Sequence, residues 1–421
     1  MKTHILRALS ERSFFNLWMG EVFTQISINI LNFFLILLVY QQTQSNTAVS
    51  AVILTFTIPA ILFGSIAGAY VDHWNKKKVL LITNASRAFL LLVLAINADN
   101  LALIYIISLL ITMITQFFIP AETPMIPIIV KRENLLSANA LFGMGISGSI
   151  VVAYVLSGPL MKYLGEVETL IFLAVMLLIA AFFIWFIRLP SKIESAEERA
   201  SKQKINILHD IKYAFSFLSK QKEISQALFF LALTQVLTLV IATVAPGYAN
   251  SILHVSIQDF SLYFAAPAAL GMIVGAIILV NFFHNYSKEK IITFGIFLSG
   301  IAMMFLPYGS KVVSRGFVQT INLHLAPFFT IDILFFMIFL VFLIGIANAL
   351  VFVPANTIVQ ENTTDELRGK IYGFLNTIVG VFSLLPILIV GGLSDLIGVG
   401  SVMLGIGLSL FILGISRLFS R

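Results

Sequence analysis

Long apolar runs recur along the whole chain and are separated by short polar segments. A membrane-spanning helix needs about 20 mostly apolar residues to cross about 30 Å of hydrocarbon. Only helices or closed barrels satisfy their backbone groups in lipid, and these runs are too long and too continuously apolar for barrel strands. The pattern therefore predicts an all-α integral membrane protein with twelve transmembrane helices, over residues 14–41, 47–71, 79–97, 101–122, 136–164, 167–188, 224–250, 260–283, 290–307, 331–356, 369–394 and 397–418.

Composition excludes the other broad classes of protein. Of the 421 residues, 59% are hydrophobic and 11% are charged, whereas soluble domains have about 45–50% apolar and about 25% charged residues. An ordinary soluble enzyme and a disordered chain are both excluded by this excess of apolar surface. The absence of cysteine excludes a disulfide framework and thiolate metal sites, and the scattered histidines predict no metal centre. No Walker loop or nucleophile elbow is present. We therefore expect that the protein binds no cofactor and is not an enzyme.

The distribution of Lys and Arg predicts the topology. Of the 26 basic residues, 22 lie in segments on one side of the predicted spans. The other side holds Lys162, Lys311 and Arg315, and Arg87 lies within a span. By the positive-inside rule, both termini and the central loop are cytoplasmic in a multi-pass plasma (inner) membrane protein. The run that begins at residue 14 is too long for a signal peptide, so we expect it to be the first span. This bias accounts for the net charge of +6 without a nucleic-acid partner.

Two halves of the chain resemble each other. "FIPAETPMIP" in the first half matches "FVPANTIVQE" in the second, and "SGPLMKYLG" matches "VGGLSDLIG", so that Gly165 aligns with Gly398. Parallel repeats of this kind permit rocking about a central site. The sequence predicts an N-terminal six-helix bundle over 1–188, a cytoplasmic linker with an amphipathic helix over 189–222, and a C-terminal six-helix bundle over 223–421, the two bundles being pseudo-symmetric.

The loop after the second span carries a recognisable motif. It reads "GAYVDHWNKKKV" from Gly68, and it resembles the signature loop of the major facilitator superfamily, with Gly68, Asp72, Lys76 and Lys77 at matching positions. The resemblance implies a gating loop in which Gly68 allows close helix approach and Asp72 pairs with a neighbouring helix. Asn75 replaces the family's glycine, and we expect it to adopt the left-handed backbone of a tight turn. The alternative is that the lysines only anchor the topology.

The resemblance covers nearly the whole chain and extends to a branch of the family. The segments after the fourth and tenth spans look like those of macrolide and drug efflux proteins and enterobactin exporters, although lysophospholipid transporters share much of the pattern. Gly158 and Pro159 partly match the glycine-rich antiporter motif, with simple helix packing as the alternative. The resemblance implies a proton-coupled exporter of small amphiphilic compounds that works by alternating access. The alternatives are a lipid transporter of the same fold and a non-transporting sensor.

Polar side chains inside predicted spans are candidate functional groups, because they are costly in lipid. Glu21, Gln25, Asn29 and Asn32 form a stripe on one face of the first span. Glu21 is a candidate proton carrier, or it only pairs with Arg87. Arg87 is expected to form a structural pair or to extend to the cytoplasmic surface. Glu122 is a second proton-coupling candidate, or it is merely interfacial.

Further cavity candidates fall mainly on the spans that usually line the cavity in this superfamily. They are Gln116, Thr234, Gln235, Thr238, Asn348 and Asn376. The expected partners are a small-molecule substrate, protons and the lipid bilayer, and we expect a monomer. The long outer loop 308–330 is either a lid or an insertion.

Overall fold

The computed structural model describes residues 9–71, 73–189, 221–253, 255–283, 286–309, 333–363 and 365–419. These residues form helices and connecting turns, without a β-strand in the ranges just given. Eleven of the described helices are long and apolar enough to cross a membrane. The predicted ninth span is α13 (Lys288–Phe305), which begins with three charged residues, Lys288, Glu289 and Lys290. The predicted linker 189–222, with its amphipathic helix, and the outer loop 308–330 lie almost entirely outside the described residues.

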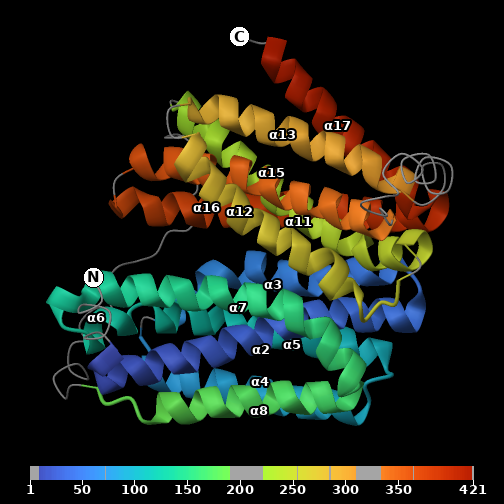
Figure 1. Ribbon diagram of the computed structural model, residues 1–421. Coiled ribbons are helices and arrows are strands. Elements are labelled where there is room, and N and C mark those ends of the chain that lie inside the picture. The colour runs from blue at the N-terminus through green and yellow to red at the C-terminus, as the bar shows by residue number, and fades with distance from the viewer. Residues whose placement is uncertain are drawn as a thin grey trace, which may run out of the picture. The chain divides into compact units, whose positions relative to one another are not determined.

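The helices correspond to the predicted spans and form two compact units (Figure 1). The first comprises Met1–Gln42 and Leu54–Ile207, and the second comprises Thr43–Ile53 and Leu208–Arg421. Unit 1 contains α2 (Arg12–Thr43, except its last residue), most of α3 (Asn46–Val71), α4 (Lys76–Ile96), α5 (Leu101–Glu122), α6 (Met125–Ile129), a short 3-10 turn (Arg132–Asn134), α7 (Leu135–Tyr163) and α8 (Glu166–Trp185). Unit 2 contains the start of α3, α11 (Lys222–Tyr248), α12 (Ala266–Phe282), α13, α15 (Ile333–Glu361), α16 (Asp365–Ile397) and α17 (Val399–Phe419).

Asparagine side chains begin two helices of unit 1. Asn75 caps α4 by accepting a hydrogen bond from the backbone N–H of Lys78 at 3.0 Å, and Asn100 caps α5 in the same way from Leu103 at 3.1 Å. An N-cap requires an extended backbone, and Asn75 has φ −66° and ψ 107°. The expectation of a left-handed Asn75 is therefore wrong, because the turn uses its side chain as a helix cap.

In each predicted half, a glycine at the equivalent position lies in the connection that precedes the last helix. Gly165 precedes α8 with φ +96°, and Gly398 precedes α17 with φ +85°. Side chains disfavour this left-handed region, and glycine enters it without steric cost. The sequence match that aligned these two glycines thus corresponds to the same backbone feature in both halves.

Within unit 1, α4 packs along α8 and α5 (Figure 1). Helix α2 contacts α8 at Gly20, where an added Cβ would lie 2.8 Å from Ile184. It contacts α7 through Trp18, whose indole N–H donates to the carbonyl of Leu141 at 3.0 Å. Helix α2 therefore has neighbours on two sides, and the polar stripe that it carries lies within a packed helix bundle.

Within unit 2, α12 and α15 approach each other closely at small residues. A Cβ added to Gly271 would lie 2.1 Å from the carbonyl oxygen of Phe342, and one added to Gly345 would lie 2.1 Å from that of Ala268. Contacts this short are impossible, so the backbone spacing depends on glycine at both positions. Small residues commonly allow this kind of close helix packing in membranes.

We predict that Gly271→Ala destabilises the protein, because the new methyl group must push α12 away from α15. Overpacking of this kind costs about 1–3 kcal/mol, which exceeds the gain of about 1 kcal/mol in helix propensity. Gly405→Ala on α17 is the matched control, since a Cβ there meets no described atom within 4 Å. Thermal unfolding in detergent should show a lower Tm for the first variant and an unchanged or higher Tm for the second. Equal effects would contradict the close approach.

Candidate functional site: a buried carboxyl pair and an apolar groove

Three ionisable side chains of unit 1 are buried together. Glu21 lies on α2, Arg87 on α4 and Glu122 at the end of α5. Their exposed fractions are 0%, 0% and 4%. Both carboxyl groups interact electrostatically with Arg87. The structure thus brings together the two proton-coupling candidates, Glu21 and Glu122, and Arg87, the basic residue that the sequence placed within a span.

Arg87 is held by neutral partners. Its guanidinium donates to the side-chain oxygens of Asn84 at 2.6 Å and Thr115 at 3.3 Å, and its Nε donates to the carbonyl of Thr83 at 3.2 Å. The guanidinium also lies 4.6 Å from the ring centre of Phe118, a cation–π arrangement. Complete burial contradicts the alternative in which Arg87 extends to the membrane surface.

The two carboxyl groups face each other without an intervening cation. Glu122 lies within side-chain hydrogen-bonding reach of Glu21, and among the described residues Arg87 makes no ion pair within 4.0 Å. Two ionised carboxylates offer no donor to each other, so a hydrogen bond between them would form only with one of them protonated. Glu122 is buried at the end of α5.

Three buried polar atoms around this cluster have no hydrogen-bond partner among the described residues. They are Oε2 of Glu21, Oε1 of Glu122 and Nδ2 of Asn84. An unpartnered buried polar group costs about 1–3 kcal/mol, and more when it is charged. A proton on one carboxyl group would supply the donor that the two carboxyl oxygens lack.

The polar stripe on α2 is a connected ladder. Gln25 donates to Glu21 at 2.8 Å, and Asn29 donates to the backbone carbonyl of Gln25 at 2.8 Å and to its side-chain oxygen at 3.3 Å. Asn32 is half-buried one turn further along. On the neighbouring helix α5, Gln116 bonds only to the carbonyl of Thr112, at 3.3 Å. Three of the four stripe residues are thus linked to the carboxyl pair.

The signature loop is described only in part. Asp72 lies outside the described residues, and an added Cβ at Gly68 would meet no described atom within 4 Å, so the expected close approach at Gly68 is not seen. Lys76 is buried. The ammonium of Lys77 donates to the carbonyls of Trp185 and Ile187, at 2.6 and 2.8 Å, at the end of α8. Lys77 therefore fixes the carboxyl terminus of α8, where a cation is favourable.

Gly158 and Pro159 lie in the interior of α7, and Gly158 is buried. The ring of Tyr154, one turn earlier, packs against Phe33 of α2 with centroids 5.6 Å apart. These contacts are consistent with a packing role for this segment.

The candidates in unit 2 are more dispersed. Thr234 of α11 and Asn348 of α15 line the same small cavity of about 30 Å³. Thr238 bonds to the carbonyl of Thr234 at 2.8 Å. Gln235 is half-buried on α11, and Asn376 is exposed on α16. The described part of unit 2 has no buried Asp, Glu, His, Lys or Arg side chain, in contrast to unit 1.

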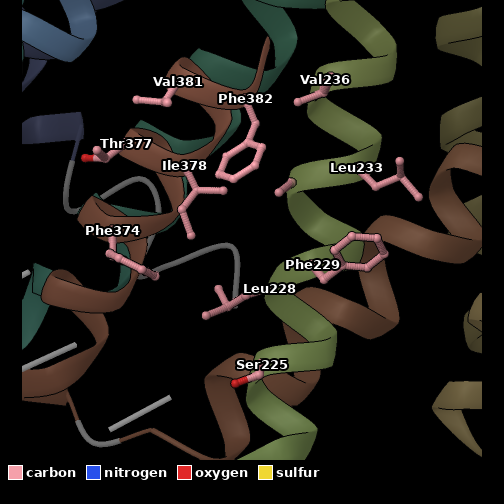
Figure 2. A pocket seen from close by; sticks show the side chains of 11 residues that line it. Ser225, Leu228, Phe229, Leu233, Val236, Phe374, Thr377, Ile378, Val381 and Phe382 are labelled. Carbon is pink, nitrogen blue, oxygen red and sulfur yellow. The ribbon is translucent and has the colours of Figure 1, made fainter. Parts of the chain in front are cut away.

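A large apolar groove lies between α11 and α16. Its cavity volume is about 740 Å³, which falls within the range of about 300–1,000 Å³ for ligand pockets. Figure 2 shows Ile378 and Phe382 of α16 pointing toward α11, which contributes Leu228 and Val236. Ser225 and Thr377 are the only polar side chains among its lining residues, and none is charged. The composition of the sequence indicated an apolar pocket but not its position.

Sequence reasoning missed the neutral partners of the charged cluster. Asn84 receives hydrogen bonds from Arg87 and from Thr24 of α2, the latter at 3.2 Å, and Thr115 is the second side-chain acceptor for Arg87. The spacing of three residues between Asn84 and Arg87 was a usable signal, since it places both on one helix face. No comparable signal pointed to Thr115, because its contact depends on how two helices pack.

The family is decided by the sequence comparison. The profile of the Major Facilitator Superfamily matches residues 17–385. The chain belongs to this superfamily. It is 22% identical over 409 residues to the uncharacterized MFS-type transporter YfmI of Bacillus subtilis, covering 95% of this chain and 94% of that protein. It is 25% identical over 305 residues to macrolide efflux protein A of Streptococcus pyogenes, covering 69% and 71% of the two chains.

Solved transporter structures share the fold. The nucleoside transporter NupG superposes with a TM-score of 0.72 at 13% identity, covering 96% of this chain and 98% of that one. The peptide transporter PepTSo superposes with a TM-score of 0.69 at 14% identity, covering 97% and 98%. The chain is thus a multi-pass membrane transporter of small molecules rather than an enzyme.

We predict that Arg87→Leu strongly destabilises the protein and that adding Glu21→Gln recovers part of the loss. Removing one partner from a buried charged cluster costs about 3–5 kcal/mol because the opposite charge stays uncompensated. Neutralising Glu21 removes some of that penalty, so the double variant should be more stable than the sum of the single effects predicts. Thermal unfolding of the four proteins in detergent measures this. Additive losses would show that Arg87 and Glu21 do not interact.

Proposed function

We propose that this transporter is a proton-coupled exporter of small amphiphilic compounds that works by alternating access. The observation that carries the proposal is the buried pair of Glu21 and Glu122 beside Arg87. A transporter that only needed to anchor a helix would gain nothing from two carboxyl groups in contact, since buried charge is costly in a membrane.

Charge balance explains how the pair would carry a proton. With one shared proton, the two carboxyl groups hold one negative charge, which the guanidinium of Arg87 neutralises. Loss of that proton leaves a net negative charge, which is unfavourable unless water or a cation reaches the cluster. Proton release is therefore linked to opening of the site, and rebinding of a proton is linked to closing.

The apolar groove between α11 and α16 supports the class of substrate. Its lining suits the hydrocarbon part of an amphiphile, because the polar contribution comes from Ser225 and Thr377 alone. The relative named as a macrolide efflux protein favours a bulky lipophilic cargo. None of the relatives and structures named above is a lipid transporter by name. We propose that the groove binds the apolar body of the exported compound.

Direction and topology complete the proposal. The basic residues favour a plasma membrane protein with both termini in the cytoplasm. Export against a gradient then requires entry of protons from outside, which defines an antiporter. We expect a monomer, since each chain holds both the carboxyl pair and the groove.

We predict that Glu21→Gln and Glu122→Gln abolish proton-driven accumulation of a lipophilic cationic dye in inverted membrane vesicles. Exchange of one proton for one dye molecule would support about a tenfold concentration ratio for each pH unit if the potential does not contribute. The variants should still equilibrate the dye down its own gradient, because the groove is intact.

Glu133→Gln is the matched control, since Glu133 is exposed in the short turn before α7. It should accumulate the dye like the unmodified protein. Dye uptake that ignores the pH gradient in the unmodified protein would refute proton coupling, whatever the variants do.

We predict that Phe382→Ala raises the apparent KM for the dye about tenfold while kcat changes less. Phe382 is 68% exposed toward the groove and has free surface to bury, and full burial of such a side chain is worth about 1.5–3 kcal/mol. Phe294→Ala on α13 is the control, because Phe294 is similarly exposed (49%) but does not line the groove. An unchanged KM in both variants would indicate that lipid, rather than substrate, occupies the groove.

A further inference from the structure

We propose that Asp395 holds the first turn of α3 as a releasable latch that keeps the outer side of the transporter closed, an inference that rests on the alternating-access function proposed above. Asp395 lies near the end of α16, and the first residues of α3 pack beside it within unit 2. We call Asp395 together with Ser45, Asn46 and Thr47 the α3 latch.

Five hydrogen bonds converge on one carboxylate in this latch. The hydroxyl groups of Ser45 and Thr47 each donate at 2.7 Å. The backbone N–H groups of Asn46 and Thr47 donate at 2.8 and 3.0 Å, and the side-chain amide of Asn46 donates at 2.9 Å. The carboxylate of Asp395 thus satisfies the free backbone donors at the start of α3, a place where negative charge is favourable.

Close packing surrounds these hydrogen bonds. A Cβ added to Gly391, one turn before Asp395, would lie 2.0 Å from the hydroxyl oxygen of Ser50. Ser50 itself donates to the carbonyl of Ile387 at 2.8 Å. A Cβ added to Gly247 of α11 would lie 2.3 Å from the side-chain oxygen of Asn46. The start of α3 is therefore seated against α16 and α11 along two turns.

The position of the latch in the chain gives it a role in transport. Helix α3 belongs to the predicted N-terminal bundle, and α16 belongs to the predicted C-terminal bundle. The residues between the first two predicted spans, and those between the last two, lie on the predicted outer side. The latch therefore joins a helix of each predicted bundle at their outer ends, and opening this side requires all five hydrogen bonds to break together.

The exposure of Asp395 makes the latch reversible. Asp395 is exposed, whereas Asn46 is only 4% exposed. Water can solvate the carboxylate as soon as α3 moves away, so release does not leave a charge buried in lipid.

The absence of cysteine from the chain allows a direct test. Val49→Cys places a single thiol on α3 at a residue that is 0% exposed. Intact cells that express this reporter are treated with a membrane-impermeant maleimide, with and without Asp395→Asn. Each charge-assisted hydrogen bond contributes more than a neutral one, so we expect labelling to be about tenfold faster in the variant. Asp99→Asn, at an exposed turn before α5, is the control and should label at the original rate.

A second variant separates a latch from a simple helix cap. Ser45→Ala with Thr47→Val keeps the carboxylate and both backbone donors but removes the two hydroxyl groups, so its labelling rate should fall between the other two. Added dye should also change labelling in the Asp395 protein, because transport opens the latch. Identical labelling rates in all variants, or labelling that ignores the dye, would overturn the proposal and leave a static cap.

Failure of the latch can be distinguished from failure of proton coupling. Dye uptake that is insensitive to pH removes the proton claim, yet labelling that accelerates in Asp395→Asn would still establish the latch. Gradient-driven uptake together with an unchanged labelling rate would support proton coupling and refute the latch.

Discussion

The need to neutralise charge inside a membrane governs the organisation of unit 1. A guanidinium with no exposed surface sits among three helices, and it is tolerated because Asn84, Thr115 and the Phe118 ring replace its water while two carboxyl groups balance its charge. The helices α2, α4 and α5 must therefore pack so that these groups meet. The same packing brings the two carboxyl groups together, and the proposed proton coupling rests on this arrangement.

Unit 2 is organised by backbone proximity rather than by charge. Its helices α12 and α15 touch at Gly271 and Gly345, where side chains would collide with carbonyl oxygens. The described part of this unit buries no Asp, Glu, His, Lys or Arg side chain, and an apolar groove lies between its helices α11 and α16. This contrast supports the proposal that unit 1 binds the proton and that unit 2 binds the apolar substrate.

Asp395 shows a third way of using charge. Its carboxylate is exposed and accepts hydrogen bonds from the backbone N–H groups in the first turn of α3. A hydrogen bond to a charged group is stronger than one between neutral groups. Where water can reach the charged group, however, water replaces the broken bond, so the net free energy of breaking it is small. This property suits a contact that must form and release in each cycle, whereas the buried cluster around Arg87 suits a group that changes its proton but keeps its place.

The sequence alone determined the class of protein, the succession of long apolar helices, the superfamily and the three ionisable residues that lie buried together in unit 1. These follow from apolar length, motif spacing and the rarity of charge in lipid, all of which are local properties of the chain. Only the tertiary structure decided that Glu21 and Glu122 face each other, that Asn75 is a helix cap, that α11 and α16 enclose a groove, and that Asp395 holds α3. Each of these depends on side chains from segments far apart in the chain or on one backbone conformation, and neither is encoded in a periodic pattern.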